Sequence, residues 1–354
     1  MLVISHFSAL QAIRYARKTY SALPWSAIGR VEQRKALNGC IPTCDSIDFN
    51  TLSRYGIWND DDLEELHVLV ASSGARRNKA KVRCHVWSSP LPNAALLKVA
   101  PDIYCCSPAF TALQCSIGKD VAHALMVILE LLGTYALPPE STFAIAHRGH
   151  WPDFSDRASV EQAHYRCEPA TILKELRAIA KWTKSSSASS FRQAVQIAAE
   201  GSASPGESIM FGMFGTPKRY GGFGCNSLPK GGMLLNRRLD FSRDAMHMAS
   251  GMPYAILDAM IPAAKTDLEY NGLGHEQTAA RIHDGNRNNG LKGMGYKVIV
   301  INRDQMRDVV ALEAIARSIY RDAGVRFRYS ANGYRNRQVA MLNGLRAATG
   351  LAPI

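Results

Sequence analysis

The chain has 354 residues, more than one compact core usually holds, so two domains are expected. Hydrophobic residues make up 47% and charged residues 20%, which excludes a disordered chain, and the net charge of +12 favours polyanionic partners. No apolar stretch reaches the roughly 18 residues of a membrane span, and the N-terminus lacks a signal-peptide pattern. We therefore expect a cytoplasmic protein without a membrane partner.

The eight cysteines are scattered along the chain, and none forms a Cys-x-x-Cys pair. A structural zinc site needs paired ligands at such short spacings. We therefore expect reduced, mostly buried thiols rather than a zinc frame.

Residues 1–165 mix helical and strand patterns and predict an α+β domain. Apolar residues at helical spacing predict a helix over 6–17, whereas 81–87 is typical of a strand. Residues 107–137 predict a helical hairpin that is interrupted near 116–118. The following segment, 166–202, is expected to be a helical linker that contains a short Ser-rich turn.

Residues 203–354 predict the second domain. Ser204, Pro205 and Glu207 form the pattern of a helix start, with an N-cap, a proline at the first position and a capping carboxylate. The order of helix, three strands, helix, strand and helix predicts an α/β class with a mixed sheet flanked by helices. The expected strands are 233–241, 253–261, 263–272 and 296–302, and the later helices are 275–295 and 305–322.

Two carboxylates of this domain fall on consecutive strands. Asp258 lies on the second strand and Glu269 on the third, so a hairpin between these strands can place them side by side. Adjacent carboxylates repel one another unless a cation lies between them, and Mg²⁺ or Mn²⁺ prefers such oxygen ligands. A metal held there could activate water for attack on a phosphodiester. Glu207 could be a further ligand, or it could only cap its helix.

Polar residues that follow the third strand extend this pattern. His275 could act in proton transfer or contact a phosphate. Asn271 and Gly272 are also typical of a simple turn. Asp284 and Arg287 are three residues apart and share a helix face, where they could contact DNA or form a surface ion pair.

The ordered motifs SPGE, PKRYGGFG, LDAMIP, LEYNGLGH and HDGNRNNGLKGMGYKVIVIN resemble the group of bacterial proteins related to the very-short-patch-repair endonuclease. That group belongs to the PD-(D/E)XK nuclease superfamily. The resemblance covers roughly residues 203–305 and implies a restriction-endonuclease-like domain that hydrolyses DNA with Mg²⁺ or Mn²⁺, in DNA repair or in defence against phages and mobile elements.

The resemblance also implies roles for individual residues of these motifs. Asp258 and Glu269 would hold the metal, and Asn271 occupies a position that is usually acidic in the group. An amide oxygen can bind a metal, but it brings no charge and cannot act as a base. The implied catalytic residues are Glu207, Asp258, Glu269, Asn271 and His275, and Asp284 and Arg287 also match the motifs of the group. The expected DNA contacts are Lys218, Arg219, Asp284 and Arg287, together with Arg326 and Arg328 of a basic cluster beyond the matched segment. Asp267 has no role in this assignment.

The first half, with SHFSALQAIRYAR, HVWSSPLP and CCSPAFTALQCS, resembles the N-terminal part of proteins similar to type IV toxin–antitoxin antitoxins. This resemblance implies a DNA-binding module, and a toxin or another defence protein as partner. Two functions therefore stay open: a metal-dependent DNA endonuclease, and a non-catalytic DNA-binding regulator or antitoxin on a degenerate nuclease fold. An adaptor that binds no nucleic acid fits the basic charge poorly.

Overall fold

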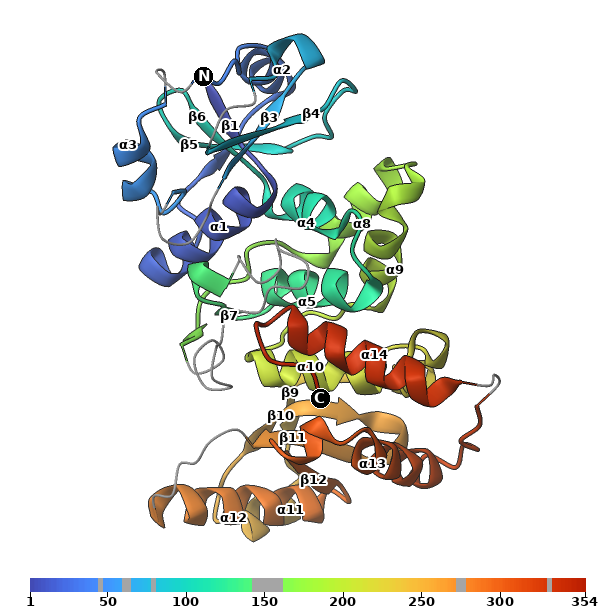
Figure 1. The fold of residues 1–354 in the computed structure, drawn as a ribbon. Helices are drawn as coiled ribbons and strands as arrows, with labels where there is room; N and C mark the ends of the chain where they lie inside the picture. The colour runs from blue at the N-terminus through green and yellow to red at the C-terminus, as the bar shows by residue number, and fades with distance from the viewer. Residues whose placement is uncertain (44–46, 59–64, 78–80, 142–161, 272–277, 330–332) are drawn as a thin grey trace. The chain divides into compact units, whose positions relative to one another are not determined.

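The computed structural model divides into two compact units, which are described separately (Figure 1). Unit 1 comprises Met1–Ala198 and Ala347–Ala352, and unit 2 comprises Ala199–Arg346 and Pro353–Ile354. Mixed sheets flanked by helices confirm the expected α/β class. The described residues are 1–43, 47–58, 65–77, 81–141, 162–271, 278–329 and 333–354.

Within those residues, no helix combines the length and the apolar composition that a bilayer span requires.

Unit 1 is built on a six-stranded mixed sheet with the order β2-β5-β6-β1-β3-β4. The central strand β1 runs parallel to β6 and antiparallel to β3. A separate two-stranded sheet pairs β7 with β8. The strands are β1 Leu2–Ile4, β2 Ser26–Ala27, β3 Leu66–Val70, β4 Val82–Val86, β5 Leu96–Ala100, β6 Ile103–Cys106, β7 Tyr135–Ala136 and β8 His164–Tyr165.

The predicted helical hairpin of unit 1 is confirmed as α4 and α5, which the segment Ile117–Asp120 separates. The helices α8 and α9 pack on this pair, so the segment expected to be a linker belongs to unit 1 as far as Ala198. The α-helices of this unit are α1 His6–Tyr20, α2 Arg30–Asn38, α3 Phe49–Arg54, α4 Pro108–Ser116, α5 Val121–Leu132, α8 Leu173–Trp182 and α9 Ser189–Ile197.

A buried ion pair connects α1 to α5. The guanidinium of Arg14 donates to both carboxylate oxygens of Glu130, at 2.9 Å and 2.6 Å, and both side chains are 1% exposed. Arg14 also donates to the hydroxyl of Ser141. These bonds satisfy two charges that would be costly to bury alone.

Unit 2 has the four-stranded sheet β12-β11-β10-β9, in which β9, β10 and β11 form an antiparallel meander and β12 runs parallel to β11. The predicted order of helix, three strands, helix, strand and helix is present, but the short helix α11 interrupts the strands between β9 and β10, and α14 follows α13. The strands are β9 Leu234–Asp240, β10 Tyr254–Ile261, β11 Thr266–Asn271 and β12 Lys297–Asn302. The α-helices are α10 Pro205–Gly215, α11 Arg243–Met248, α12 Thr278–Gly293, α13 Val309–Asp322 and α14 Tyr334–Ala347.

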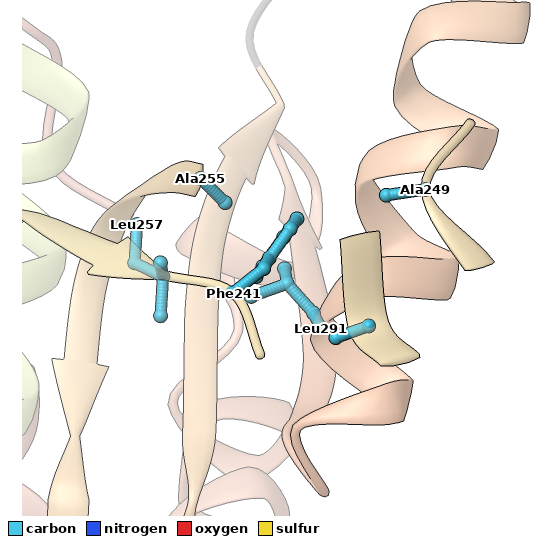
Figure 2. Packing of buried hydrophobic residues seen from close by; sticks show 6 residues of the cluster. Phe241, Ala249, Ala255, Leu257 and Leu291 are labelled. Atoms are coloured by element: carbon cyan, nitrogen blue, oxygen red, sulfur yellow. The ribbon is translucent and has the colours of Figure 1, made fainter. Parts of the chain in front are cut away.

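An apolar cluster holds α11 and α12 against β10. It joins Phe241, Ala245 and Ala249 to Ala255 and Leu257 of β10 and to Leu291 of α12. Figure 2 shows Phe241 near Ala255 of the strand and Leu291 of the helix. This packing positions the helix that carries Arg287 against the sheet.

The start of α10 approaches β11 closely. A Cβ atom added to Gly206 would lie 2.1 Å from Cε1 of Tyr270, so only glycine allows this approach. The next residue on the helix is Glu207. The close contact therefore places the Glu207 carboxylate near the middle strands of the sheet.

Candidate functional site

Asp258 and Glu269 occupy neighbouring positions on paired strands. The register of β10 and β11 pairs Ala259 with Leu268, and continuing it by one residue places Asp258 opposite Glu269. Directly opposite residues on antiparallel strands have Cβ atoms about 5 Å apart. The backbone N–H of Tyr270 also donates to Oδ2 of Asp258 over 3.2 Å. The two predicted metal ligands are therefore adjacent.

Glu207 lies in the first turn of α10, where the predicted cap is formed. Ser204 accepts a hydrogen bond from the Glu207 N–H, and its hydroxyl donates to Oε1 of Glu207. The Ala203 N–H donates to Oε2 over 2.9 Å. Glu207 therefore caps its helix, as expected for one of its two predicted roles, and is 7% exposed.

Asn236 on β9 joins Glu207 to the sheet. Its amide nitrogen donates to Oε2 of Glu207 over 2.6 Å and to the carbonyl oxygen of Gly201 over 2.7 Å. The backbone of Asn236 has a φ of 45°, in the left-handed region. The pairing of β9 with β10 brings this irregular position opposite Asp258. The sequence did not single out Asn236, because its role depends on the β9 register and on a positive φ that no motif marks.

Each carboxylate of this site makes ionisation of its neighbours less favourable. The pKa of Asp258 is raised to about 7, first by burial and then by the charges of Glu207 and Glu269. Burial also raises the pKa of Glu207, and the charge of Glu269 adds to this shift. Such mutual repulsion is the condition that a bound cation would relieve.

Asp267 belongs to the same cluster, although no role was predicted for it. Its side chain is fully buried on β11, two residues before Glu269. Burial raises its pKa, and a hydrogen bond to Glu269 and the Glu269 charge raise it further. Side chains at alternate strand positions share a face, so the spacing of Asp267 and Glu269 was the available signal.

Arg287 of α12 pairs with both acidic residues of β11. Its Nη2 atom donates to Oδ2 of Asp267 over 3.0 Å, to Oε1 of Glu269 and to the carbonyl oxygen of Ile256 over 2.7 Å. The Arg287 side chain is 12% exposed, so it faces the carboxylates. Arg287 is therefore a component of the acidic cluster in this structure, and it pairs with Asp267 and Glu269.

Two further residues predicted near this site are exposed in the structure. Asn271 is exposed at the end of β11 and pairs in register with Asn302 of β12. Asp284 is 71% exposed, and its carboxylate lies 3.7 Å from Nδ1 of His283. His275 lies outside the described residues.

Lys218 packs among aromatic rings. Its Nζ atom lies 4.4 Å from the ring centroid of Tyr320 and 4.1 Å from that of Phe327, and it donates to the carbonyl oxygen of Arg328. Burial lowers the pKa of Lys218. Lys218 therefore fixes the segment that carries Arg328.

Three of the arginines predicted to contact DNA are exposed. Arg326 and Arg328 alternate with the partly buried Phe327 and Tyr329, so the arginines and the rings project to opposite sides of an extended segment. Arg219 is exposed beside the ring of Tyr220. These guanidinium groups are available for phosphate contacts.

Across the described part of the chain, no group of three or more His, Cys, Asp or Glu side chains has the arrangement of a metal site. Arg287 occupies one oxygen of Glu269, and Glu207 is held by its own helix start and by Asn236. The side chains with chemistry suited to a hard cation are Asp258 and Glu269.

Comparison with known proteins found no family model, no curated protein and no solved structure that matches this chain.

Proposed function

We propose that unit 2 is a metal-dependent DNA endonuclease related to the very-short-patch-repair group, and that Asp258 and Glu269 are the centre of its active site. The observation that carries this proposal is their adjacency on paired strands, together with the raised pKa of Asp258. Two carboxylates held together at this cost are a common feature of functional sites. The order of strands and helices agrees with the fold that the resemblance implies.

Asp258 and Glu269 would hold Mg²⁺ or Mn²⁺. Mg²⁺ often needs only one or two protein carboxylates, because water and substrate phosphate fill its other positions. When bound, the metal would supply an activated water and stabilise the charge of the phosphodiester. Glu207 would orient the site, since Asn236 and the helix cap hold it beside Asp258.

Arg287 competes with a cation for Glu269. Its guanidinium offsets the charges of Glu269 and Asp267, and a cation at Glu269 would have to displace or share this contact. We infer that, with a cation held by Glu269, the Arg287 guanidinium would be released from this carboxylate and could contact a substrate phosphate. An arginine in that position would stabilise the negative charge that develops at phosphorus.

The ion pair between Arg287 and Glu269, together with Asn271, favours a second function, that of a non-catalytic DNA-binding protein. If Arg287 stays on Glu269, the cluster is neutralised without a metal, and Asn271 supplies no charge and no base. Unit 2 would then be a non-catalytic DNA-binding regulator or antitoxin. A toxin or another defence protein would be its partner.

Exposed arginines would bind DNA in both cases. Arg219, Arg326 and Arg328 would contact phosphates without reading the base sequence. We propose the bacterial cytoplasm as the protein's location, because the DNA substrate would be found there. The net charge of +12 supports a polyanionic partner.

The test is to incubate the full chain with supercoiled plasmid, linear duplex and single-stranded DNA, each with Mg²⁺, Mn²⁺ or EDTA. The endonuclease predicts cutting that requires the metal and that Glu269→Gln abolishes. Asp244→Asn is the matched control, because it removes an exposed carboxylate of α11 in the same unit and should leave cutting intact. Binding without cutting by the wild type would support the regulator, and the absence of both would exclude both functions.

A further inference from the structure

Unit 1 contains a cavity of about 780 Å³ between α2, the segment 87–93 and α8. Sites for small molecules commonly enclose about 300–1,000 Å³. The cavity lies wholly within unit 1, so it is separate from the carboxylates of unit 2. None of the roles considered for the acidic cluster uses it.

The charge of the cavity wall is positive. Arg30 and Arg34 are one helical turn apart on α2, and both line the cavity. Side chains four residues apart on a helix lie on the same face. The described residues that line the cavity include no Asp or Glu. Nε of Arg30 donates to Oδ1 of Asn93, which fixes one guanidinium against the opposite wall. This wall is suited to an anion.

The other wall is aromatic. The rings of Trp87 and Trp182 are stacked with centroids 5.8 Å apart and an interplanar angle of 20°, and both residues line the cavity. Phe110 contacts both rings edge-on and fixes their orientation. Both indoles are partly exposed, so part of their apolar surface is available to a ligand. Flat aromatic groups bind well to such surfaces.

We propose that this cavity binds a nucleotide unit, with its phosphate on Arg30 and Arg34 and its base against Trp87 and Trp182. A nucleotide combines the two properties that the walls require, an anionic group and a flat aromatic group. Inorganic phosphate matches only the first property and a nucleoside only the second. The nucleotide unit could be free, or it could be the phosphorylated end of a nucleic-acid strand.

Tryptophan fluorescence of the full chain provides the test, because two of the five tryptophans line the cavity. AMP and a 5′-phosphorylated trinucleotide are titrated separately, beside adenosine and inorganic phosphate. All titrations contain EDTA, so a failure of metal binding in unit 2 does not affect the result. We expect saturable quenching by AMP or by the trinucleotide, with at least about tenfold weaker binding of adenosine and phosphate.

Substitutions on α2 localise the site. Arg34→Gln removes a cavity arginine and should weaken binding by about tenfold, since a hydrogen bond to a charged group is lost. Lys35→Gln is the matched control, because this exposed neighbour carries the same charge and does not line the cavity. Trp182→Phe should reduce the amplitude of quenching.

The relative affinities identify the source of the nucleotide unit. Tighter binding of AMP indicates a free nucleotide, and tighter binding of the trinucleotide indicates a strand end. The proposal is overturned if neither ligand gives saturable quenching, if phosphate binds as well as AMP, or if Arg34→Gln and Lys35→Gln bind equally well.

Discussion

Asp258 is a costly charge at the scale of the single residue, because it is buried and because Glu207 and Glu269 surround it with like charge. Its pKa in the folded protein is about 7, whereas the ordinary value is 3.8. Between these two pH values, Asp258 is therefore protonated in the folded state and ionised in the unfolded state. Stability is lost as the pH rises through this window, and the loss is complete above the folded pKa.

Asp258→Asn should remove this cost. We expect the free energy of unfolding at about pH 8 to rise by about 2 kcal/mol relative to the wild type, and to be unchanged near pH 4. Chemical denaturation followed by circular dichroism at the two pH values measures the difference. Asp284→Asn, at an exposed position, should change little at either pH. An equal gain at both pH values would show that charge repulsion is not the cause.

Glu130 shows the opposite case, a buried charge that is fully paired. Glu130→Gln leaves the buried Arg14 without its counter-charge, so we expect unit 1 to lose about 3–5 kcal/mol of stability. All five tryptophans lie within unit 1, so fluorescence-detected denaturation reports this loss specifically. A loss below about 1 kcal/mol would mean that water or another group compensates for the missing carboxylate.

At the scale of the element, the approach of α10 to β11 determines where Glu207 lies. Gly206→Ala would place Cβ against the ring of Tyr270, forcing the helix or the ring to move. We expect a loss of about 1–3 kcal/mol of stability, and reduced cleavage in the assay described above. Gly285→Ala on α12 is the control, because an added Cβ there meets no atom within 4 Å and should stabilise the helix by about 0.5–1 kcal/mol.

Rescue by a second substitution tests this steric cause. The double variant Gly206→Ala/Tyr270→Ala should recover stability relative to the sum of the two single changes, because the clashing ring is absent. Additive losses would contradict the clash.

The order of elements in unit 2 was predictable because the signals are local. Alternating apolar residues marked the strands, and Ser204 with Pro205 marked the start of α10. The adjacency of Asp258 and Glu269 followed from the hairpin alone. The helix α11 between β9 and β10 was not predicted, because its six residues are too few for a helical period to be recognised.

The surroundings of several side chains were not predictable, because they depend on contacts between distant elements. Arg287 turns toward Asp267 and Glu269 only because α12 packs on the sheet through Leu291. Lys218 packs among rings from a segment about a hundred residues later. No spacing along the chain contains this information.

At the scale of the whole molecule, the two units should respond to pH in opposite directions. Burial lowers the pKa of His6 well below its ordinary value, and nearby His85, His67 and Arg83 add to this. Burial and the charges of Arg83 and Arg76 lower that of His85 to about 4. The unfolded state therefore binds these protons first, and the stability of unit 1 is lost as the pH falls from about 6.5 through 4.

Thermal unfolding at about pH 7.5 and pH 5 separates the two responses. The midpoint seen by tryptophan fluorescence, which reports unit 1, should fall on acidification. In unit 2, Asp258 should take up a proton over the same interval, so its repulsion with Glu207 and Glu269 should weaken and unit 2 should become more stable. His85→Asn should reduce the shift in the fluorescence midpoint, and an unchanged shift in this variant would mean that other groups cause the acid sensitivity.

DNA binding by the whole molecule should depend strongly on salt, because phosphate contacts release counterions. The double variant Arg326→Gln/Arg328→Gln should lower the slope of log affinity against log salt by about 2 on duplex DNA. The control Arg54→Gln changes an arginine of α3 outside the proposed DNA surface. Fluorescence anisotropy at several salt concentrations measures the slope, and an equal slope for both variants would exclude the segment from the DNA interface.

The central claim is that Asp258 and Glu269 hold a divalent cation. Electron paramagnetic resonance of Mn²⁺ added to the full chain at about pH 7.5 measures this directly, as the loss of signal from free Mn²⁺. We predict saturable binding by the wild type and by Asp284→Asn, and its loss in Asp258→Asn and Glu269→Gln. Equal binding by Glu269→Gln and the wild type, or no binding by the wild type, would contradict the claim.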